Sequence, residues 1–381
     1  MKKKVESCQT RLGKVGGQAV LEGVMMKAGA RTVTTCRRED GTLVVTDDSF
    51  VSVRKKHKIL NIPILRGVVN FVEMLILSMK TLGASAEALG IDEEESEGRF
   101  TKWLKKHLKI DLTDFIMVIS TILGLALSVV LFIFLPSLVS YGVDFIIGLI
   151  WEGASLGVFT AVVEGVVKVG IFLAYLSLVS LMPDIKRTFM YHGAEHKSIA
   201  CFEAGEELTP ENAKRHTRFH PRCGTSFMFF MILLGIIAGL FIRILLPGLD
   251  LWVYTLIRLL ILPILVGLGY EVIMLAGKHP NALTRAISAP GLWVQRITTK
   301  EPTLDMLEVA IVSIKCALRD ESPEFSEFYS TRAWEKKEEK TEEAAEFECE
   351  IQAAREDEIA EEAVEEKKEP GAATEVEEDD S

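Results

Sequence analysis

Histidines form the most specific chemical pattern in the chain. Five of the seven histidines lie between positions 192 and 279, and the first pair, His192 and His196, encloses Glu195 in the order H-x-x-E-H. Side chains four residues apart share one face of a helix, so both imidazoles would point the same way. Inverted zinc-protease motifs have this order: two imidazoles hold the metal, and the glutamate deprotonates metal-bound water. The pattern predicts a divalent-metal site, with zinc as the first candidate and Glu195 as the general base.

A second histidine pair follows at the same spacing. His216 and His220 are four residues apart, and Cys223 adds a thiolate, which is a soft metal ligand. Thr209 reads as the N-cap of a short helix over residues 210–219. On that helix the second pair would share a face and could meet the first pair.

Glu271 is the candidate for a remote ligand, because a carboxylate inside an apolar run is a candidate functional residue by default. The predicted metal ligands are His192, His196, His216, His220, Cys223 and Glu271. A catalytic zinc takes three protein ligands, so this number leaves open whether one pair has another role or two metals bind. Gly193 is an argument against the helical metal motif, because glycine costs a helix about 1 kcal/mol relative to Ala. Histidines at a membrane interface can also bond headgroups or carbonyls without any metal.

Long apolar runs must position these residues. Four runs are long enough to cross a hydrocarbon core of about 30 Å, which takes about 20 helical residues. They cover residues 115–143, 165–182, 226–247 and 251–277. The predicted fold is therefore an α-helical polytopic membrane protein with about four transmembrane helices, a small N-terminal cytoplasmic β element and a disordered acidic C-terminal tail.

Two further apolar segments do not fit a simple crossing. Residues 62–82 carry Arg66, Glu73 and Lys80 at intervals of seven, and a crossing there would place the base-rich N-terminus outside. We therefore expect a helix that lies in the interface. Residues 145–163 are interrupted by charge and glycine, which predicts an interfacial or re-entrant segment.

Lys and Arg set the predicted orientation. Residues 1–114 and 183–225 are rich in bases, whereas 144–164 and 248–250 contain none. The positive-inside rule then places both termini in the cytoplasm and the protein in the cytoplasmic (inner) membrane as a multi-pass protein. All six cysteines fall in cytoplasmic segments, where disulfides are not expected.

The predicted organisation has five parts. It comprises a β-containing segment (1–60), an amphipathic helix with a basic linker (61–112), the membrane domain (113–277) with a histidine-rich loop (183–225), a cytoplasmic extension (278–321) and the tail (322–381). In the first part, residues 32–37 and 42–46 flank an Asp-Gly turn, and residues 18–21 are a candidate third strand. The net charge of −11 comes from the tail, because residues 335–381 contain 21 acidic and 6 basic residues, which leaves +4 elsewhere. So acidic a segment cannot bury enough apolar surface to fold.

Five separated motifs resemble those of the YqhQ family of bacterial membrane proteins. They are Val15–Met26, Ile64–Gly67, Tyr191–His196, His220–Ser226 and Pro290–Thr299, and they span roughly residues 10 to 320. The family is a domain of unknown function (DUF1385) described as a predicted metal-dependent enzyme. The resemblance implies that Glu22, Arg66, the histidine loop and Arg296 belong to one functional assembly.

These observations favour a membrane-embedded metal-dependent hydrolase acting on an unidentified small-molecule, lipid or peptide substrate. One alternative is a metal or ion transporter, or a scaffold, with Lys168, Arg258 and Glu271 marking a pathway. A membrane di-iron oxygenase is less favoured, because such enzymes use adjacent histidines and this chain has none. The lipid bilayer is the expected partner, and a homo-oligomer stays open. Topology accounts for the basic residues, so nucleic-acid binding is not expected.

Overall fold

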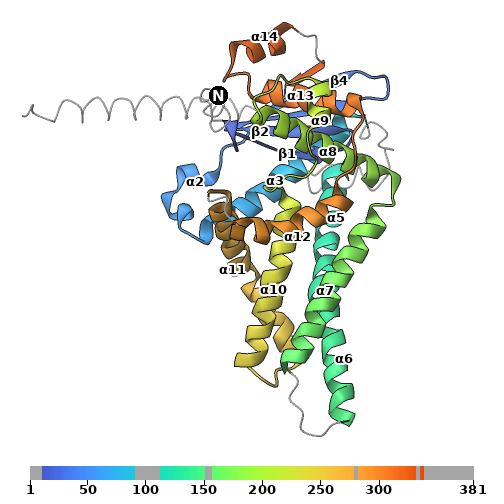
Figure 1. The fold of residues 1–381 in the computed structure, drawn as a ribbon, viewed down its shortest axis with the longest axis vertical. Coiled ribbons are helices and arrows are strands. Elements are labelled where there is room, and N and C mark those ends of the chain that lie inside the picture. Colours follow the sequence, from blue (N-terminus) through green and yellow to red (C-terminus); the bar gives the residue numbers. More distant parts are fainter. Residues whose placement is uncertain (1–10, 91–111, 151–156, 279–281, 332–334, 339–381) are drawn as a thin grey trace, which may run out of the picture. The chain divides into compact units, whose positions relative to one another are not determined.

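A computed structural model describes residues 11–90, 112–150, 157–278, 282–331 and 335–338 (Figure 1). The chain divides into two compact units, 1–337 and 338–381. The fold described below is that of the first unit.

The N-terminal part is an antiparallel meander. Its strands are β1 (Val15–Val20), β2 (Gly23–Ala28), β3 (Arg31–Arg37) and β4 (Leu43–Ser49), and β5 (Glu335–Glu338) follows β4 in the sheet order. Gly29 and Gly41 take positive φ at the connections after β2 and β3, a conformation that glycine adopts without steric cost. The predicted β element is confirmed, and β2 adds a strand that the sequence pattern did not reveal.

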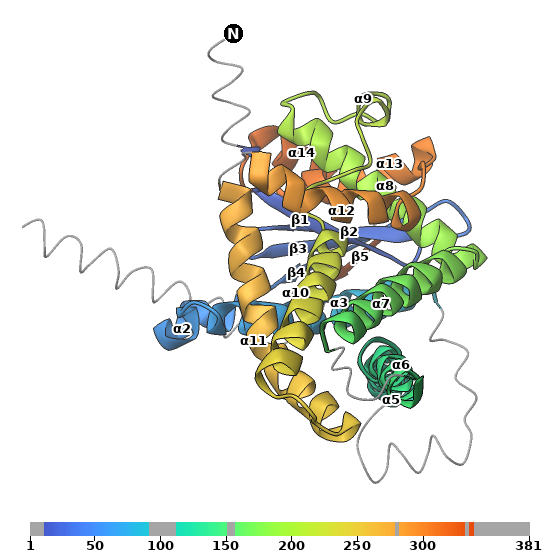
Figure 2. The same ribbon diagram turned by 60° about the horizontal axis from the view of Figure 1, so that its bottom comes forward.

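Helices cover both faces of this sheet, because successive side chains of a strand point to opposite faces. Val24 and Met26 belong to the core shared with α8 (Pro183–Glu203) and α13 (Leu304–Ala317). Met25 packs with Leu77 and Ala88 of α3 (Leu65–Ala88) on the other side. Figure 2 shows α8 and α13 on one side of the strands and α3 on the other. The predicted histidine-rich loop (183–225) therefore begins with a 21-residue helix that packs on the sheet.

Long apolar helices make up most of the remainder. They are α5 (Leu112–Val129), continued through a π-helical turn η3 (Val130–Phe134) into α6 (Leu135–Ile150), α7 (Gly157–Val179), α10 (Gly224–Leu245) and α11 (Leu251–Lys278). By length and composition, five helices of the described chain are candidate membrane spans: 65–88, 118–150, 158–179, 224–245 and 251–275. The four predicted runs are among them, and α3 is the fifth. The chain is thus a mostly helical multi-pass membrane protein.

Helix ends refine two predicted segments. Residues 145–150 continue α6, residues 157–163 begin α7, and residues 151–156 lie outside the described part, so the interfacial or re-entrant placement of 145–163 stays a prediction. The tail does not begin at residue 322, because α14 (Pro323–Thr331) packs on α13, with the Arg319 guanidinium 4.0 Å from the centroid of the Tyr329 ring. The acidic residues 339–381 lie outside the described residues.

Helix α3 differs from the other four apolar helices in its neighbours. Near its start, Gly67 contacts α11, where a Cβ atom on Gly67 would lie 2.7 Å from Tyr270 Cβ. Its second half packs on the sheet, and Gln18 of β1 bonds to Ser78. Its opposite side exposes apolar residues such as Leu75 and Ile76. Polar and sheet contacts on one side and bare apolar surface on the other are typical of a helix lying in the membrane interface.

The described part of the chain also contains three short helical elements, α2 (Val53–Lys56), η1 (Lys58–Asn61) and α9 (Pro210–Arg215), and the longer helix α12 (Ala282–Thr298). Helix α12 packs against α10 and α7 and leads into the segment that crosses α8. It therefore links the apolar helices to the histidines of α8.

Candidate metal centre

Helix α8 places the first histidine pair on one face. The ring centroids of His192 and His196 lie 4.4 Å apart. Gly193, between them, is required by a close approach, since a Cβ atom there would lie 2.1 Å from the carbonyl oxygen of Lys300. The Lys300 amide also donates to the Phe189 carbonyl oxygen at 2.8 Å. Glycine at position 193 lowers the helix propensity of α8, but it allows residues 300–302 to cross the helix beside the histidines.

Cys223 joins this pair from a different element. It is the N-cap of α10, and its Sγ lies 3.2 Å from His192 Nε2. The ligand atoms of His192, His196 and Cys223 all lie within 4.8 Å of one another. Bond lengths of about 2.0 Å to nitrogen and 2.3 Å to sulfur separate the ligand atoms of one tetrahedral zinc by about 3.3–3.8 Å. A small closure of these three side chains would therefore bind one ion.

Hydrogen bonds assign the tautomers of the two imidazoles. His192 Nδ1 lies 2.9 Å from the Thr298 carbonyl oxygen, and His196 Nδ1 lies 2.6 Å from the Arg218 carbonyl oxygen. A carbonyl only accepts, so each Nδ1 carries the proton and each Nε2 keeps its lone pair. Burial lowers the pKa of His196, which favours the neutral ring. Metal-binding histidines show this arrangement, in which one nitrogen donates to the protein and the other faces the metal.

Buried polar contacts hold the backbone around the cluster. Gln295 of α12 is fully buried; its Oε1 accepts from the His220 amide, and its Nε2 donates to the His220 carbonyl oxygen, both at 2.8 Å. Glu301 pairs with Arg218 at 2.9 Å and Lys197 at 3.0 Å. The segments that supply Cys223 and the Arg218 carbonyl are therefore tied to α12 and α8.

Glu195 lies between α8 and strand β1. It is 5% exposed, and a Cβ atom on Gly17 would lie 3.2 Å from its Cγ, so the glycine makes room for this side chain. Burial raises the pKa of Glu195 to about 7, and the neighbouring His192 opposes the rise. A carboxyl group with such a pKa can both accept and release a proton near neutral pH.

The second histidine pair does not join the cluster as predicted. Helix α9 starts at the Thr209 cap but ends at Arg215, and His216 has an extended backbone, so His216 and His220 do not share a helical face. His216 Nε2 lies 3.2 Å from Glu206 Oε2, in a separate group with Cys201, whose thiol pKa burial raises to about 11.

His220 and Glu271 are engaged elsewhere. The His220 ring centroid is 5.5 Å from that of His196, but His220 Nε2 faces Glu203, with its Oε2 at 3.7 Å. Glu271 accepts from Arg66 Nε at 2.6 Å in a contact between α11 and α3. The sequence predicts Glu271 as a ligand because it is a carboxylate inside an apolar run near the cytoplasmic end of a membrane helix. The structure places it with Arg66 instead of in the histidine and cysteine group.

The structure separates the residues that the resemblance places in one functional assembly: Glu22 lies near the histidines, and Arg66 and Arg296 do not join them. Glu22 sits in the β1–β2 turn with φ of 45° and accepts from Arg187 and from the Tyr191 hydroxyl, next to His192. Arg66 lies with Glu271, and Arg296 is exposed.

Sequence reasoning missed Gln295, the buried neighbour of Arg296. A usable signal was present, because Gly291, Gln295 and Thr298 follow the i, i+4, i+7 spacing of one helical face. A Cβ atom on Gly291 would lie 2.6 Å from Ser226 Cα, so this face packs directly on the start of α10.

Comparisons with known proteins agree with the five motifs. The family model described as "Protein of unknown function (DUF1385)" matches residues 62–320. The "Uncharacterized protein YqhQ" of Bacillus subtilis (strain 168) is 36% identical over 312 residues, which cover 81% of this chain and 93% of that protein. No solved structure matches the chain significantly. Both the matched length and this identity show that the chain belongs to the DUF1385 family.

Proposed function

We propose that this membrane protein binds a divalent metal, zinc first, through His192, His196 and Cys223, and hydrolyses a substrate there with Glu195 as general base. The observation that supports this most strongly is the pair of Nδ1–H···O=C bonds. They leave the Nε2 lone pairs of two α8 histidines on the side of the Cys223 thiol, which belongs to the N-cap of α10. Three protein ligands leave a fourth position of a tetrahedral ion for water, as in catalytic zinc sites.

The proposed chemistry uses each group once. The metal would hold a water molecule and acidify it, and the Glu195 carboxylate would take its proton. The hydroxide would form a bond to an acyl or phosphoryl centre. The proton on Glu195 would pass to the leaving group as its bond breaks, which restores the carboxylate. Peptide, lipid and lipid-linked substrates all fit a site next to membrane helices.

A structural metal is the second candidate, and His220 favours it. Its ring lies against that of His196, so a turn of the side chain away from Glu203 would supply a fourth protein ligand. A closed four-ligand site would join α8 to the segment before α10 and perform no chemistry.

Cobalt substitution distinguishes these two functions. With Co²⁺ in the purified protein, we expect a thiolate-to-metal charge-transfer band that Cys223→Ser removes. An added small anion such as azide should change the visible spectrum, because a three-ligand site has room for it. A spectrum that does not respond to azide in the wild type but responds in His220→Ala would assign the site to structure instead of hydrolysis.

A further inference from the structure

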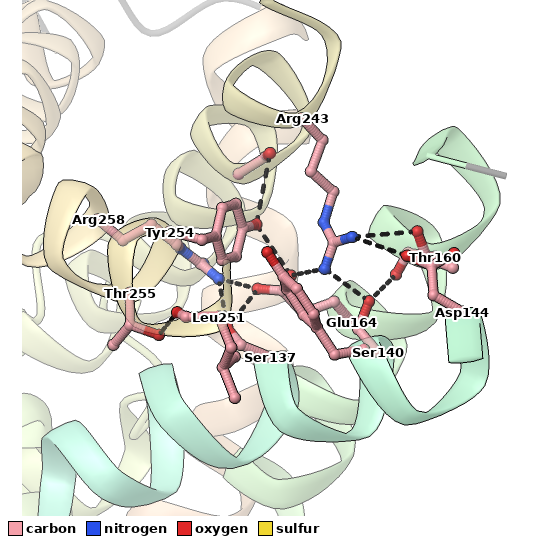
Figure 3. A network of polar contacts seen from close by, with 12 residues as sticks. Ser137, Ser140, Asp144, Thr160, Glu164, Arg243, Leu251, Tyr254, Thr255 and Arg258 are labelled. Atoms are coloured by element: carbon pink, nitrogen blue, oxygen red, sulfur yellow. Dashed lines mark hydrogen bonds and ion pairs between the residues drawn. The ribbon is translucent and has the colours of Figure 1, made fainter. Parts of the chain in front are cut away.

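A network of charged and polar residues lies along the second half of α10 (Figure 3). The figure shows Ser137, Ser140 and Asp144 of α6, Thr160 and Glu164 of α7, Arg243 of α10, and Tyr254 and Arg258 of α11. Lys168 of α7 also approaches Glu164. The network first reaches α10 at Gly235, whose carbonyl oxygen accepts from Arg258. Gly235 is twelve residues beyond Cys223, so about 18 Å of helix separates the network from the candidate metal centre. The network is therefore independent of the function proposed above.

Glu164 is the centre of the network, and each of its carboxylate oxygens already has a close partner. Its Oε1 pairs with Arg258, and its Oε2 accepts from the Tyr254 hydroxyl at 2.9 Å. Arg243 reaches the same Oε2 at 3.4 Å, and Lys168 approaches Oε1 at 3.8 Å. One carboxylate thus faces three cations, and the last two contacts are longer than the roughly 2.7–2.9 Å of a strong charge-assisted hydrogen bond.

The charges in this network do not balance. We call Lys168, Arg243 and Arg258 the cation cluster; their side chains are 5%, 9% and 5% exposed. Against them stand buried Glu164 and, at the rim, Asp144, which is 38% exposed and 3.4 Å from Arg243. Uncompensated charge inside apolar helices is costly, and such residues usually face a partner or a ligand.

Two donors of the cluster lack an acceptor. Arg243 Nε is buried without a hydrogen-bond partner. The Lys168 ammonium has one partner among the described residues, the Glu164 oxygen at 3.8 Å, which is beyond hydrogen-bonding distance. Both the surplus charge and the free N–H groups could be satisfied by an anion with several oxygens.

We propose that the cation cluster binds a phosphate oxyanion, carried by an anionic lipid headgroup or by a free phosphate ion. Arg243 lies two residues before the end of α10, at the depth where headgroups meet the hydrocarbon core. Its contacts to Asp144 and Thr160, at 3.4 and 3.2 Å, are long enough to be exchanged for phosphate oxygens. A basic pocket between membrane helices has the charge needed to hold a phosphate headgroup. Lys168 adds a positive charge on the other side of Glu164, 3.8 Å from its Oε1.

The test is lipid binding in phosphate-free maltoside micelles, followed by native mass spectrometry and thermal unfolding. Phosphatidylglycerol is added in one arm and inorganic phosphate in the other. We expect phosphatidylglycerol to bind the wild type, and Arg243→Gln or Lys168→Met to weaken binding at least about fivefold. Lys14→Gln is the charge-matched control, because Lys14 is an exposed residue paired with Glu321; its binding should match that of the wild type.

Thermal unfolding of Lys168→Met with and without lipid gives a second readout, which separates a loss of lipid binding from a loss of stability. Without phosphate it should raise Tm, because it removes surplus buried charge; with saturating phosphatidylglycerol the wild type should become the more stable protein. If only inorganic phosphate produces this reversal, the source of the oxyanion is free phosphate. If neither additive raises Tm of the wild type, or if Lys168→Met is less stable with and without them, the proposal is overturned.

Discussion

The two ends of α10 hold polar groups in opposite ways. At its start, His192 and His196 each donate one N–H to a backbone carbonyl and keep one lone pair for the space beside Cys223. In its second half, three cations, Lys168, Arg243 and Arg258, face the carboxylates of Glu164 and Asp144. The proposals above assign a cation to the first arrangement and an anion to the second. Both rest on the hydrogen-bonding groups that each cluster leaves unsatisfied, more than on its residue types.

The largest expected effect concerns Glu164. Replacing it by Ala would leave three buried cations without their shared carboxylate, and losing one partner of a buried pair costs about 3–5 kcal/mol. Thermal unfolding in maltoside micelles measures the loss. Asp144→Asn is the control, because Asp144 is 38% exposed and 3.4 Å from Arg243, so its loss should cost about 1 kcal/mol or less. Equal losses in the two variants would contradict the central position of Glu164.

Gln295 tests the organisation of the other end. Gln295→Leu leaves the His220 amide and carbonyl oxygen buried without partners, at about 1–3 kcal/mol each. It should also weaken metal binding by about 10–100-fold, as loss of an outer-shell contact does. Competition with a zinc-selective chelator measures the affinity. The neighbouring exposed variant Arg296→Gln should change neither quantity, and a parallel change in both variants would refute the role of Gln295.

A smaller effect is expected at Gly193. Gly193→Ala adds a methyl group against the Lys300 carbonyl oxygen, and overpacking costs about 1–3 kcal/mol although alanine is the better helix former by about 1 kcal/mol. Gly170→Ala in α7, where nothing lies within 4 Å of the new Cβ, should instead be neutral or stabilising. Thermal unfolding of both variants decides the point, and a stabilised Gly193→Ala would show that residues 300–302 do not cross α8 there.

Local patterns predicted much of this fold, and long-range packing explains what they missed. Apolar runs located the membrane helices, and the Asp-Gly turn located β3 and β4, because both signals are contained within a few turns of chain. Helix α9 ended at Arg215 because its continuation is drawn into contacts with Gln295 and Glu301, which lie about 80 residues away. No local signal contains those partners.

The candidate site shows the same division. The H-x-x-E-H spacing placed His192 and His196 on one face, as the structure has them, because residues four apart always meet on a helix. The positions of His216, Glu271 and Gln295 depend on how separate helices cross, and spacing alone carries no such information. Gly193 illustrates the limit: local propensity counted it as a cost, and tertiary packing requires it.

Metal content tests the central claim most directly. Elemental analysis would compare the purified wild type with His192→Ala/His196→Ala and with the control His216→Ala, all of verified folding. We predict about one zinc or other divalent ion per chain in the wild type and in His216→Ala, and none in the double variant. Metal retained in the double variant, or absent from the wild type after growth with added zinc, would contradict the assignment of this cluster as a metal centre.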